Sequence, residues 1–150
     1  MSVTPSADSA TVNGRYSIST DPARLDHEAI HAYLTTSYWA RGRTLGDVLR
    51  SIRHSLSFGL YDGEIQIGFA RVVTDYVAHA HLCDVYVVDA YQGQGLGTWL
   101  IHTVLQYPEL QSIRRWTLAT SDAHDFYARF GFGPIGIPDK YMELLRTTQS

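Results

Sequence analysis

The sequence is poor in the residues that support disulfides, structural zinc and lysine chemistry. Its 150 residues include one cysteine, Cys83, so no disulfide can form within the chain, and no Cys/His spacing suits zinc. We therefore expect a reducing, cytoplasmic setting and no metal site. Only one of the 12 basic residues is a lysine, Lys140, which argues against a mechanism built on a Schiff base.

Surplus charge and long apolar runs are also lacking. Lys and Arg number 12 against 15 Asp and Glu, a net charge of -3, and no basic patch is visible, so nucleic acid is not an expected partner. No apolar run approaches the ~20 residues that a membrane helix needs. The first residues lack the basic and apolar parts of a signal peptide, so we expect neither membrane insertion nor export by that route.

What the chain does contain is the composition of a packed globule. Apolar residues make up 45% and charged residues 18%, and the length suits one domain. Residues 1–14 are rich in Ser, Thr and Ala, which predicts a flexible tail, and residues 15–150 are expected to form a single domain.

Periodicity and turn residues predict a mixed α and β fold. Asp26 and Thr44 are expected helix caps, Thr44 with Asp47 in a capping box, and Asp62-Gly63 is expected to turn a hairpin. The predicted strands are 15–20, 56–61, 64–75, 77–88, 116–119, 132–135 and 141–145, and the predicted helices begin near residues 27, 45, 96 and 122.

A glycine-rich turn between a strand and a helix is the most informative segment. Glycines at 93, 95 and 97 leave the backbone bare, so several N–H groups at the helix start can converge on an anion. The P-loop pattern fails because no lysine is present, and the Rossmann pattern GxGxxG fails by one residue before the last glycine. The segment therefore predicts a cradle for an oxyanion or a phosphate of another kind.

The spacing Gln92-x-x-Gly95-x-Gly97 resembles the pyrophosphate-binding motif of the GNAT superfamily of acetyl-CoA-dependent N-acetyltransferases. The preceding strand, from Asp84, resembles the family's Leu-Tyr-Val-x-Pro-x-Tyr strand, and residues 122–132 resemble its second signature, a helix that carries Phe-Tyr and ends in Gly-Phe. Asp89-Ala90 departs from the family pattern, as does Gln92, where arginine is commoner. The resemblance covers about residues 56–135.

This resemblance implies an α/β (α+β) fold: a central mixed, mostly antiparallel twisted sheet flanked by about four helices. It implies an N-acetyltransferase that uses acetyl-CoA as cosubstrate and transfers the acetyl group to a primary amine of a small molecule or peptide by direct attack in a ternary complex. A homodimer is a further expectation of the resemblance. The alternative is a catalytically silent module that binds or senses acyl-CoA.

The resemblance also assigns cofactor-binding and acid roles. The strand would splay and bind the pantetheine arm through its backbone, and Tyr127 matches the family tyrosine that protonates the leaving thiolate. The residues expected to bind acetyl-CoA are Val85, Tyr86, Val87, Gln92, Gly93, Gln94, Gly95, Leu96, Gly97 and Thr98.

The general base is left open between Asp84 and His81, with His79 and Asp75 as weaker candidates. His79, His81 and Cys83 share one face of the strand, whereas Asp84 points to the other face unless a bulge intervenes.

The loop 38–43 joins two helices that wall the acceptor site in this family. Arg41 or Arg43 could hold a carboxylate or phosphate of the acceptor, and Trp39 could pack against its apolar part. An exposed loop whose arginines serve solubility is the alternative.

Overall fold

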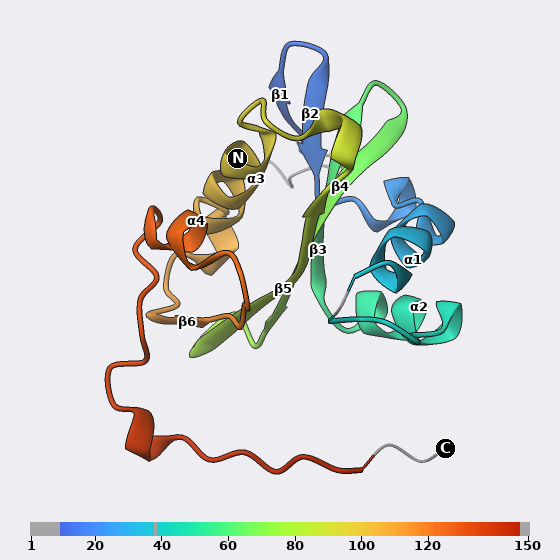
Figure 1. The fold of residues 1–150 in the computed structure, drawn as a ribbon. Coiled ribbons are helices and arrows are strands. Elements are labelled where there is room, and N and C mark those ends of the chain that lie inside the picture. The colour runs from blue at the N-terminus through green and yellow to red at the C-terminus, as the bar shows by residue number, and fades with distance from the viewer. Residues whose placement is uncertain (1–9, 38, 148–150) are drawn as a thin grey trace, which may run out of the picture. The chain divides into compact units, whose positions relative to one another are not determined.

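The computed structural model describes residues 10–37 and 39–147, which divide into two compact units, residues up to 119 and residues from 120. The first unit contains the whole sheet (Figure 1). Its elements are β1 (Thr11–Asn13), β2 (Tyr16–Ser19), α1 (His27–Thr35), α2 (Leu45–Arg53), β3 (Leu56–Asp62), β4 (Ile65–Thr74), β5 (His79–Val87), α3 (Leu96–Leu105) and β6 (Arg115–Thr117), with 3-10 turns at Pro22–Arg24, Asp89–Tyr91 and Pro108–Leu110.

The strands lie in the order β1-β2-β3-β4-β5-β6. All neighbours are antiparallel except β5 and β6, which are parallel and pair over three residues only, from His79↔Arg115 to His81↔Thr117. This mixed, mostly antiparallel sheet, with four α-helices among the described residues, confirms the predicted fold class.

The predicted caps and turn form as the local chemistry requires. The Asp26 side chain accepts the N–H of Ala29 at 3.0 Å, which fixes the start of α1. Thr44 and Asp47 form the reciprocal capping box that begins α2. Gly63 has φ +58°, the left-handed conformation that the tight β3–β4 turn needs.

The sheet is covered on both faces within this unit, by α1 and α2 on one side and by α3 on the other (Figure 1). On the first side, apolar residues of both helices pack against Phe69 of β4 and Tyr86 of β5. The Tyr86 ring stacks on Tyr33 of α1 with centroids 4.1 Å apart. This packing fixes α1 against the strand that carries the candidate site; its helical members are Ile30, Leu34, Val48 and Ile52.

Two predictions about the chain ends are wrong. Thr11–Asn13 form β1 and pair with β2, so the expected tail does not include them; residues 1–9 lie outside the described part. In the second unit α4 (His124–Ala128) forms as predicted, with Gly131 in the left-handed region behind it, but 132–135 and 141–145 are not strands. A short apolar run allows a strand, but a strand also needs a ladder partner, and the sheet of the described residues ends at β6.

Among the described residues, every helix is too short or too polar to cross a bilayer.

Candidate active site

A β-bulge reshapes the middle of β5. The register between β4 and β5 passes from Arg71↔Cys83 to Phe69↔Tyr86, so one residue of β4 faces two of β5. Asp84, the first of the two, has φ +54°. Because Asp84 contacts the Arg71 side chain, the bulge has turned it to the face that carries Cys83. The sequence left this outcome open, and the bulge decides it.

The Asp84 carboxylate joins two arginines and a tryptophan. One oxygen, Oδ2, accepts from Arg43 Nη1 at 2.8 Å and from Arg71 Nε at 2.9 Å, while Oδ1 accepts from Trp39 Nε1 at 3.2 Å. The Asp84 side chain is only 3% exposed. The buried carboxylate thus has two guanidinium groups within hydrogen-bonding distance, the pairing that a buried charge requires. The cluster therefore fastens the loop after α1 to the bulged strand.

Two histidines and a threonine form a second polar group on the same face. His79 Nε2 and His81 Nδ1 lie 3.1 and 2.8 Å from the Thr117 hydroxyl oxygen, which β6 supplies. A hydroxyl has one proton, so it donates to one ring and accepts from the other. Burial, and then the positive charge of neighbouring groups including Arg71, lowers the pKa of His81 below its ordinary value of 6.5. His81 is consequently a neutral imidazole at physiological pH.

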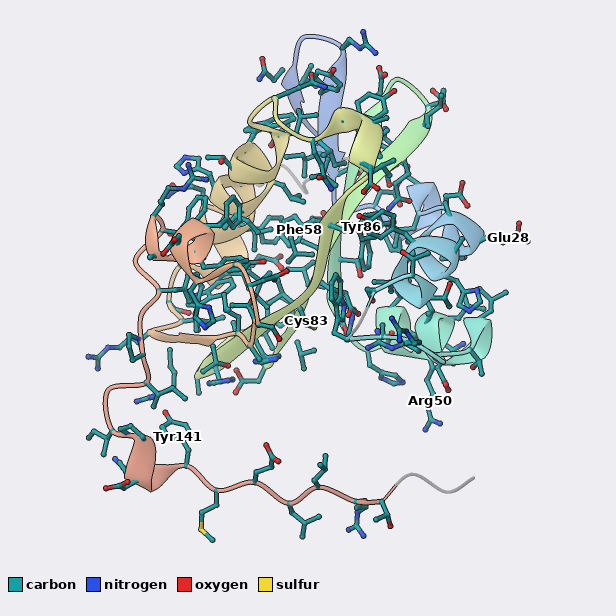
Figure 2. The ribbon with its side chains drawn as sticks, viewed as in Figure 1. Glu28, Arg50, Phe58, Cys83, Tyr86 and Tyr141 are labelled. Atoms are coloured by element: carbon teal, nitrogen blue, oxygen red, sulfur yellow. The ribbon has the colours of Figure 1, made fainter. Side chains whose placement is uncertain are left out.

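Cys83 lies on β5 (Figure 2), between His81 and Asp84 in the sequence. Burial raises the pKa of its thiol, and the nearby Arg71 offsets only part of that effect. A protonated thiol is a weak nucleophile, so the site does not favour a covalent acyl-cysteine. Among the described residues, no group of three or more His, Cys, Asp or Glu side chains is arranged to hold a metal ion.

The glycine-rich turn follows β5 and leads directly into α3. Gly93 and Gly95 have φ +81° and +82°, and a Cβ on either would meet no atom within 4 Å. The backbone is thus open on the side where a side chain would stand. Gly95 caps α3 without a side-chain hydrogen bond, and the first N–H groups of an α-helix have no partner within that helix. This arrangement fits an anion such as a pyrophosphate.

Hydrogen bonds from three tyrosines hold the glycine-rich turn and its flanks. Tyr33 donates to Asp89 Oδ1 at 3.1 Å, and Tyr16 donates to Gln94 Oε1 at 3.2 Å. Tyr91 donates to Asp62 at 2.8 Å, a carboxylate whose pKa its hydrogen bond with Arg15 lowers. The turn is therefore fixed before any ligand arrives, which reduces the entropy that binding must overcome.

The Gln92 side chain stabilises the turn from inside. Its Nε2 donates to the carbonyl oxygen of Val87 at 2.8 Å and to Asp89 Oδ1 at 3.3 Å. The sequence predicted Gln92 as a cofactor ligand. In the structure its side chain bonds to the end of β5, and its backbone N–H donates to the carbonyl oxygen of Asp89 at 3.2 Å.

One edge of β5 lies open within the sheet. Because β6 pairs only with His79–His81, residues 82–87 have no ladder partner on that side among the described strands. This stretch contains Val85–Val87, which the sequence assigned to the cofactor. Its backbone groups are available to an extended ligand.

Tyr127, Trp39 and Arg41 are the remaining predicted residues, and of these Trp39 bonds to Asp84. Tyr127 belongs to α4 in the second unit, where its half-buried ring lies edge-on to Phe126 and Phe132 at 5.0 and 6.0 Å. Trp39 is 42% exposed and Arg41 is exposed, in the loop that Arg43 ties to Asp84.

Sequence reasoning missed the residues that support this site. Arg71 and Thr117 contact residues of β5 that lie 13 and 36 to 38 residues away in the sequence, and no pattern in the sequence pairs them with those residues. The tyrosines that hold the glycine-rich turn were likewise invisible, because their hydrogen bonds span 29 to 78 residues of sequence.

Comparison with known proteins identifies the family. The family model for acetyltransferases of the GNAT family matches residues 23–132, a range that includes both polar groups and the glycine-rich turn. A Gibberella zeae protein named as an acetyltransferase, FG08082, is 31% identical over 140 residues, which cover 77% of each chain.

Solved structures support the same family. A GNAT-family acetyltransferase from Xanthomonas campestris pv. campestris is 42% identical, with a TM-score of 0.85 over 87% of this chain and 93% of its own. Rv2747 from Mycobacterium tuberculosis, solved with CoA and NLQ, shares the fold at 19% identity and a TM-score of 0.59, over 75% of this chain and 70% of that one.

A bulged strand, an open sheet edge and a glycine-headed helix thus occur in a chain whose relatives are acetyltransferases. The protein belongs to the GNAT acetyltransferase family, and it is an acyltransferase enzyme.

Proposed function

We propose that this enzyme transfers the acetyl group of acetyl-CoA to a primary amine of a small molecule or peptide, by direct attack in a ternary complex. The observation that carries the proposal is the fixed glycine-rich turn at the head of α3, next to the open edge of β5. These two features offer an anion site and an extended backbone site side by side, which suits a ligand with a diphosphate and a peptide-like arm. CoA in the fold relative Rv2747 is consistent with this.

The chain's own backbone would bind the cosubstrate. In this proposal the N–H groups of Gly93–Thr98 hold the pyrophosphate, and Val85–Val87 bind the pantetheine arm as an added strand. Acetyl-CoA supplies the activated acetyl thioester. Backbone N–H groups at the bulge then stabilise the negative charge that develops on the carbonyl oxygen during attack.

His81 is the proposed general base. Both carboxylate oxygens of Asp84 accept hydrogen bonds, from Trp39, Arg43 and Arg71, whereas only one ring nitrogen of His81 is hydrogen-bonded. With His81 Nδ1–H donating to Thr117, its Nε2 keeps a lone pair that can take the proton of an ammonium acceptor.

Thr117 would pass on a proton after His81 has accepted one from the amine. In the same arrangement its hydroxyl donates to His79 Nε2, so the three side chains form a continuous hydrogen-bonded chain. When His81 gains a proton at Nε2, it can pass the Nδ1 proton to Thr117, which passes its own to His79. His81 is then neutral but holds its proton at Nε2. The base is ready again only when that proton leaves to solvent and the protons move back along the chain from His79. Thr117 is a residue that the sequence did not suggest for this chemistry.

Tyr127 is the proposed acid. The amine nitrogen forms a bond to the acetyl carbon, the carbon–sulfur bond breaks, and the Tyr127 hydroxyl gives its proton to the sulfur. The tyrosine regains a proton from solvent. A phenol suits this step because its proton affinity is close to that of a thiol.

The loop that contains Trp39 and Arg41 is the proposed acceptor wall. Arg43 and Trp39 fix it to Asp84, so the exposed Arg41 is held near the reacting strand without taking part in the ion pairs. Arg41 would then select acceptors with a carboxylate or phosphate.

Two measurements test the proposal together. Calorimetric titration with acetyl-CoA should give binding, and release of free thiol should follow on at least one member of a panel of primary amines. Binding without turnover on any amine would favour the silent acyl-CoA-sensing module. Absence of binding would overturn the assignment of the glycine-rich turn.

A further inference from the structure

The ion cluster around Asp84 carries an excess of positive charge. Arg43 and Arg71 both pair with this one carboxylate, at 2.8 and 2.9 Å, so two positive charges stand against one negative charge. The cluster is only partly accessible, since the side chains of Arg43 and Arg71 are 25% and 13% exposed. A buried or half-buried charge requires a partner, and the cluster is short of one anion.

Both guanidinium groups keep N–H groups that donate to no described residue. Arg43 donates from Nη1 alone, to Asp84. Arg71 donates from Nε to Asp84 and from Nη1 to Ser55 Oγ at 2.9 Å. Nη2 of each arginine therefore has no acceptor within the described residues, although a guanidinium has five protons to donate. The surplus charge and the unused donors belong to the same two side chains.

These donors lie on the face of the sheet that carries the proposed base. Arg71 of β4 stands directly opposite Cys83, and Val73, two residues further along β4, stands opposite His81. Side chains two residues apart on a strand, and those opposite each other on paired strands, share a face. Burial lowers the pKa of His81, and the positive charges of His79 and then Arg71 lower it further, so Arg71 acts on His81 electrostatically.

A simple alkylamine would meet an unfavourable field at this site. Like a lysine side chain, it is an ammonium ion at neutral pH, and Arg71 repels a cation that approaches His81. An acceptor that carries its own carboxylate removes this repulsion, because the carboxylate can accept from the unused N–H groups of the two arginines.

The charge of the cluster also distinguishes between anions. One carboxylate brings the sum of Arg43, Arg71 and Asp84 to zero. A phosphate monoester, with a charge of about −1.5 to −2 at pH 7, would reverse the excess and leave negative charge in a half-buried place. The cluster is therefore matched to a carboxylate.

We propose that the acceptor is an amino acid, whose carboxylate is bound by Arg43 and Arg71 while its amino group faces Nε2 of His81. This inference rests on the proposed acetyl transfer and narrows its acceptor from primary amines to those with a carboxylate close to the amine. The exposed Arg41 is then left to contact a more distant part of the acceptor.

Matched acceptors test the role of the carboxylate without altering the protein. Thiol release from acetyl-CoA is measured with a panel of natural amino acids, each compared with its carboxamide and with the amine that lacks the carboxyl group. For the preferred amino acid, kcat/KM should exceed that of either analogue by about 100-fold, because only the carboxylate accepts charge-assisted hydrogen bonds. Equal turnover of the amino acid and its carboxamide overturns this inference and leaves acetyl transfer intact.

Substitution of Arg43 separates recognition from a structural role. Arg43→Gln should lower kcat/KM for the amino acid by about 100-fold and leave that for its carboxamide unchanged. Arg43→Lys keeps a positive charge beside Asp84 and should recover part of the loss. A loss of the same size on both acceptors would mean that Arg43 only holds the loop, and this overturns the proposal.

The matched control is Arg50→Gln. It removes the same charge from an exposed side chain in the last turn of α2, which points away from the sheet (Figure 2), and the preference for the carboxylate should persist. Circular dichroism checks that all three variants are folded.

Calorimetric titration with the same amino acids, with and without CoA, measures binding separately from turnover. Binding that Arg43→Gln weakens by about 100-fold supports the carboxylate site even if no amine is acetylated, a result that would overturn only the proposed function. If no amino acid binds under either condition, the carboxylate site is overturned, whatever other amines the enzyme acetylates.

Discussion

Arg71 and Asp84 are joined across the β-bulge, with Arg71 Nε donating to Asp84 Oδ2 at 2.9 Å. The pair is well buried, with side chains 13% and 3% exposed. The same carboxylate also binds Arg43 and Trp39. Asp84 therefore connects the β-bulge of β5 to the loop of the proposed acceptor wall. The bulge places Asp84 on the same face as His81, an outcome that the sequence left open.

Loss of the Asp84 carboxylate should act mainly on stability and acceptor binding. Asp84→Ala leaves two guanidinium groups near the strand without their anion and should lower the free energy of unfolding by about 3–5 kcal/mol, measured by urea denaturation. Asp84→Asn should raise the acceptor KM more than it lowers kcat. Exposed Glu64→Gln serves as control and should change neither quantity. A collapse of kcat with an unchanged acceptor KM would instead make Asp84 the base.

Turnover should depend on pH through His81. Because the pKa of His81 lies below 6.5, kcat should rise with pH to a plateau already reached at neutral pH. His81→Gln should lower kcat by about 10²–10⁴ and remove this rise. Thr117→Val should reduce kcat less and shift the rise, since it interrupts the contact with His79. A rise that persists in His81→Gln would assign the base to another group.

The same shift predicts an effect on stability. The folded state disfavours the protonated imidazole, so the unfolded chain binds the proton more readily. Stability should therefore fall as the pH drops from about 6.5 towards the lower pKa of the folded state, and it should change no further from this source below that value. Thermal melts of the His81→Gln variant should have a smaller slope over this range. An equal slope in the two proteins would contradict the shift.

Tyr127→Phe should separate chemistry from binding. We expect kcat to fall by about 10²–10⁴ while the Kd for acetyl-CoA, measured by calorimetry, stays the same. Tyr76→Phe removes a hydroxyl from a 40% exposed tyrosine on the β4–β5 turn and should leave both unchanged. Equal losses of affinity and turnover in Tyr127→Phe would refute its role as acid.

Gly95→Glu should abolish acetyl-CoA binding. The substitution forces a side chain into a backbone with φ +82° and directs a negative charge at the proposed diphosphate site, so the Kd should rise by more than about 100-fold. Gly46→Glu makes the same change in the first turn of α2, where φ is not in the left-handed region, and should bind normally. Retained affinity in Gly95→Glu would move the cradle elsewhere.

Cys83→Ala should remain active. Its thiol is kept protonated by burial, and direct attack needs no nucleophile from the protein. Loss of all turnover in a folded Cys83→Ala variant, together with acetylated Cys83 in mass spectra of the wild-type protein, would replace direct attack with a covalent route.

Local sequence was sufficient wherever a structure depends on a few neighbouring residues. The caps at Asp26 and Thr44, the Asp62-Gly63 turn and the glycine-headed α3 each follow from the hydrogen bonds or φ angles of one short segment. The antiparallel order of β3, β4 and β5 followed because their connections are short. Of these features, the glycine-rich turn before α3 also carried the family resemblance, and with it the expected cofactor.

Tertiary structure decided everything that requires two distant segments to meet. The bulge at Asp84 exists because β4 and β5 pair with one residue in excess, and its ion pairs reach Arg43 and Arg71 from other elements. The Thr117 contact with two histidines depends on the short parallel pairing of β6. The predicted strand at 141–145 failed for the same reason: an apolar run is a property of one segment, whereas a ladder is a property of two.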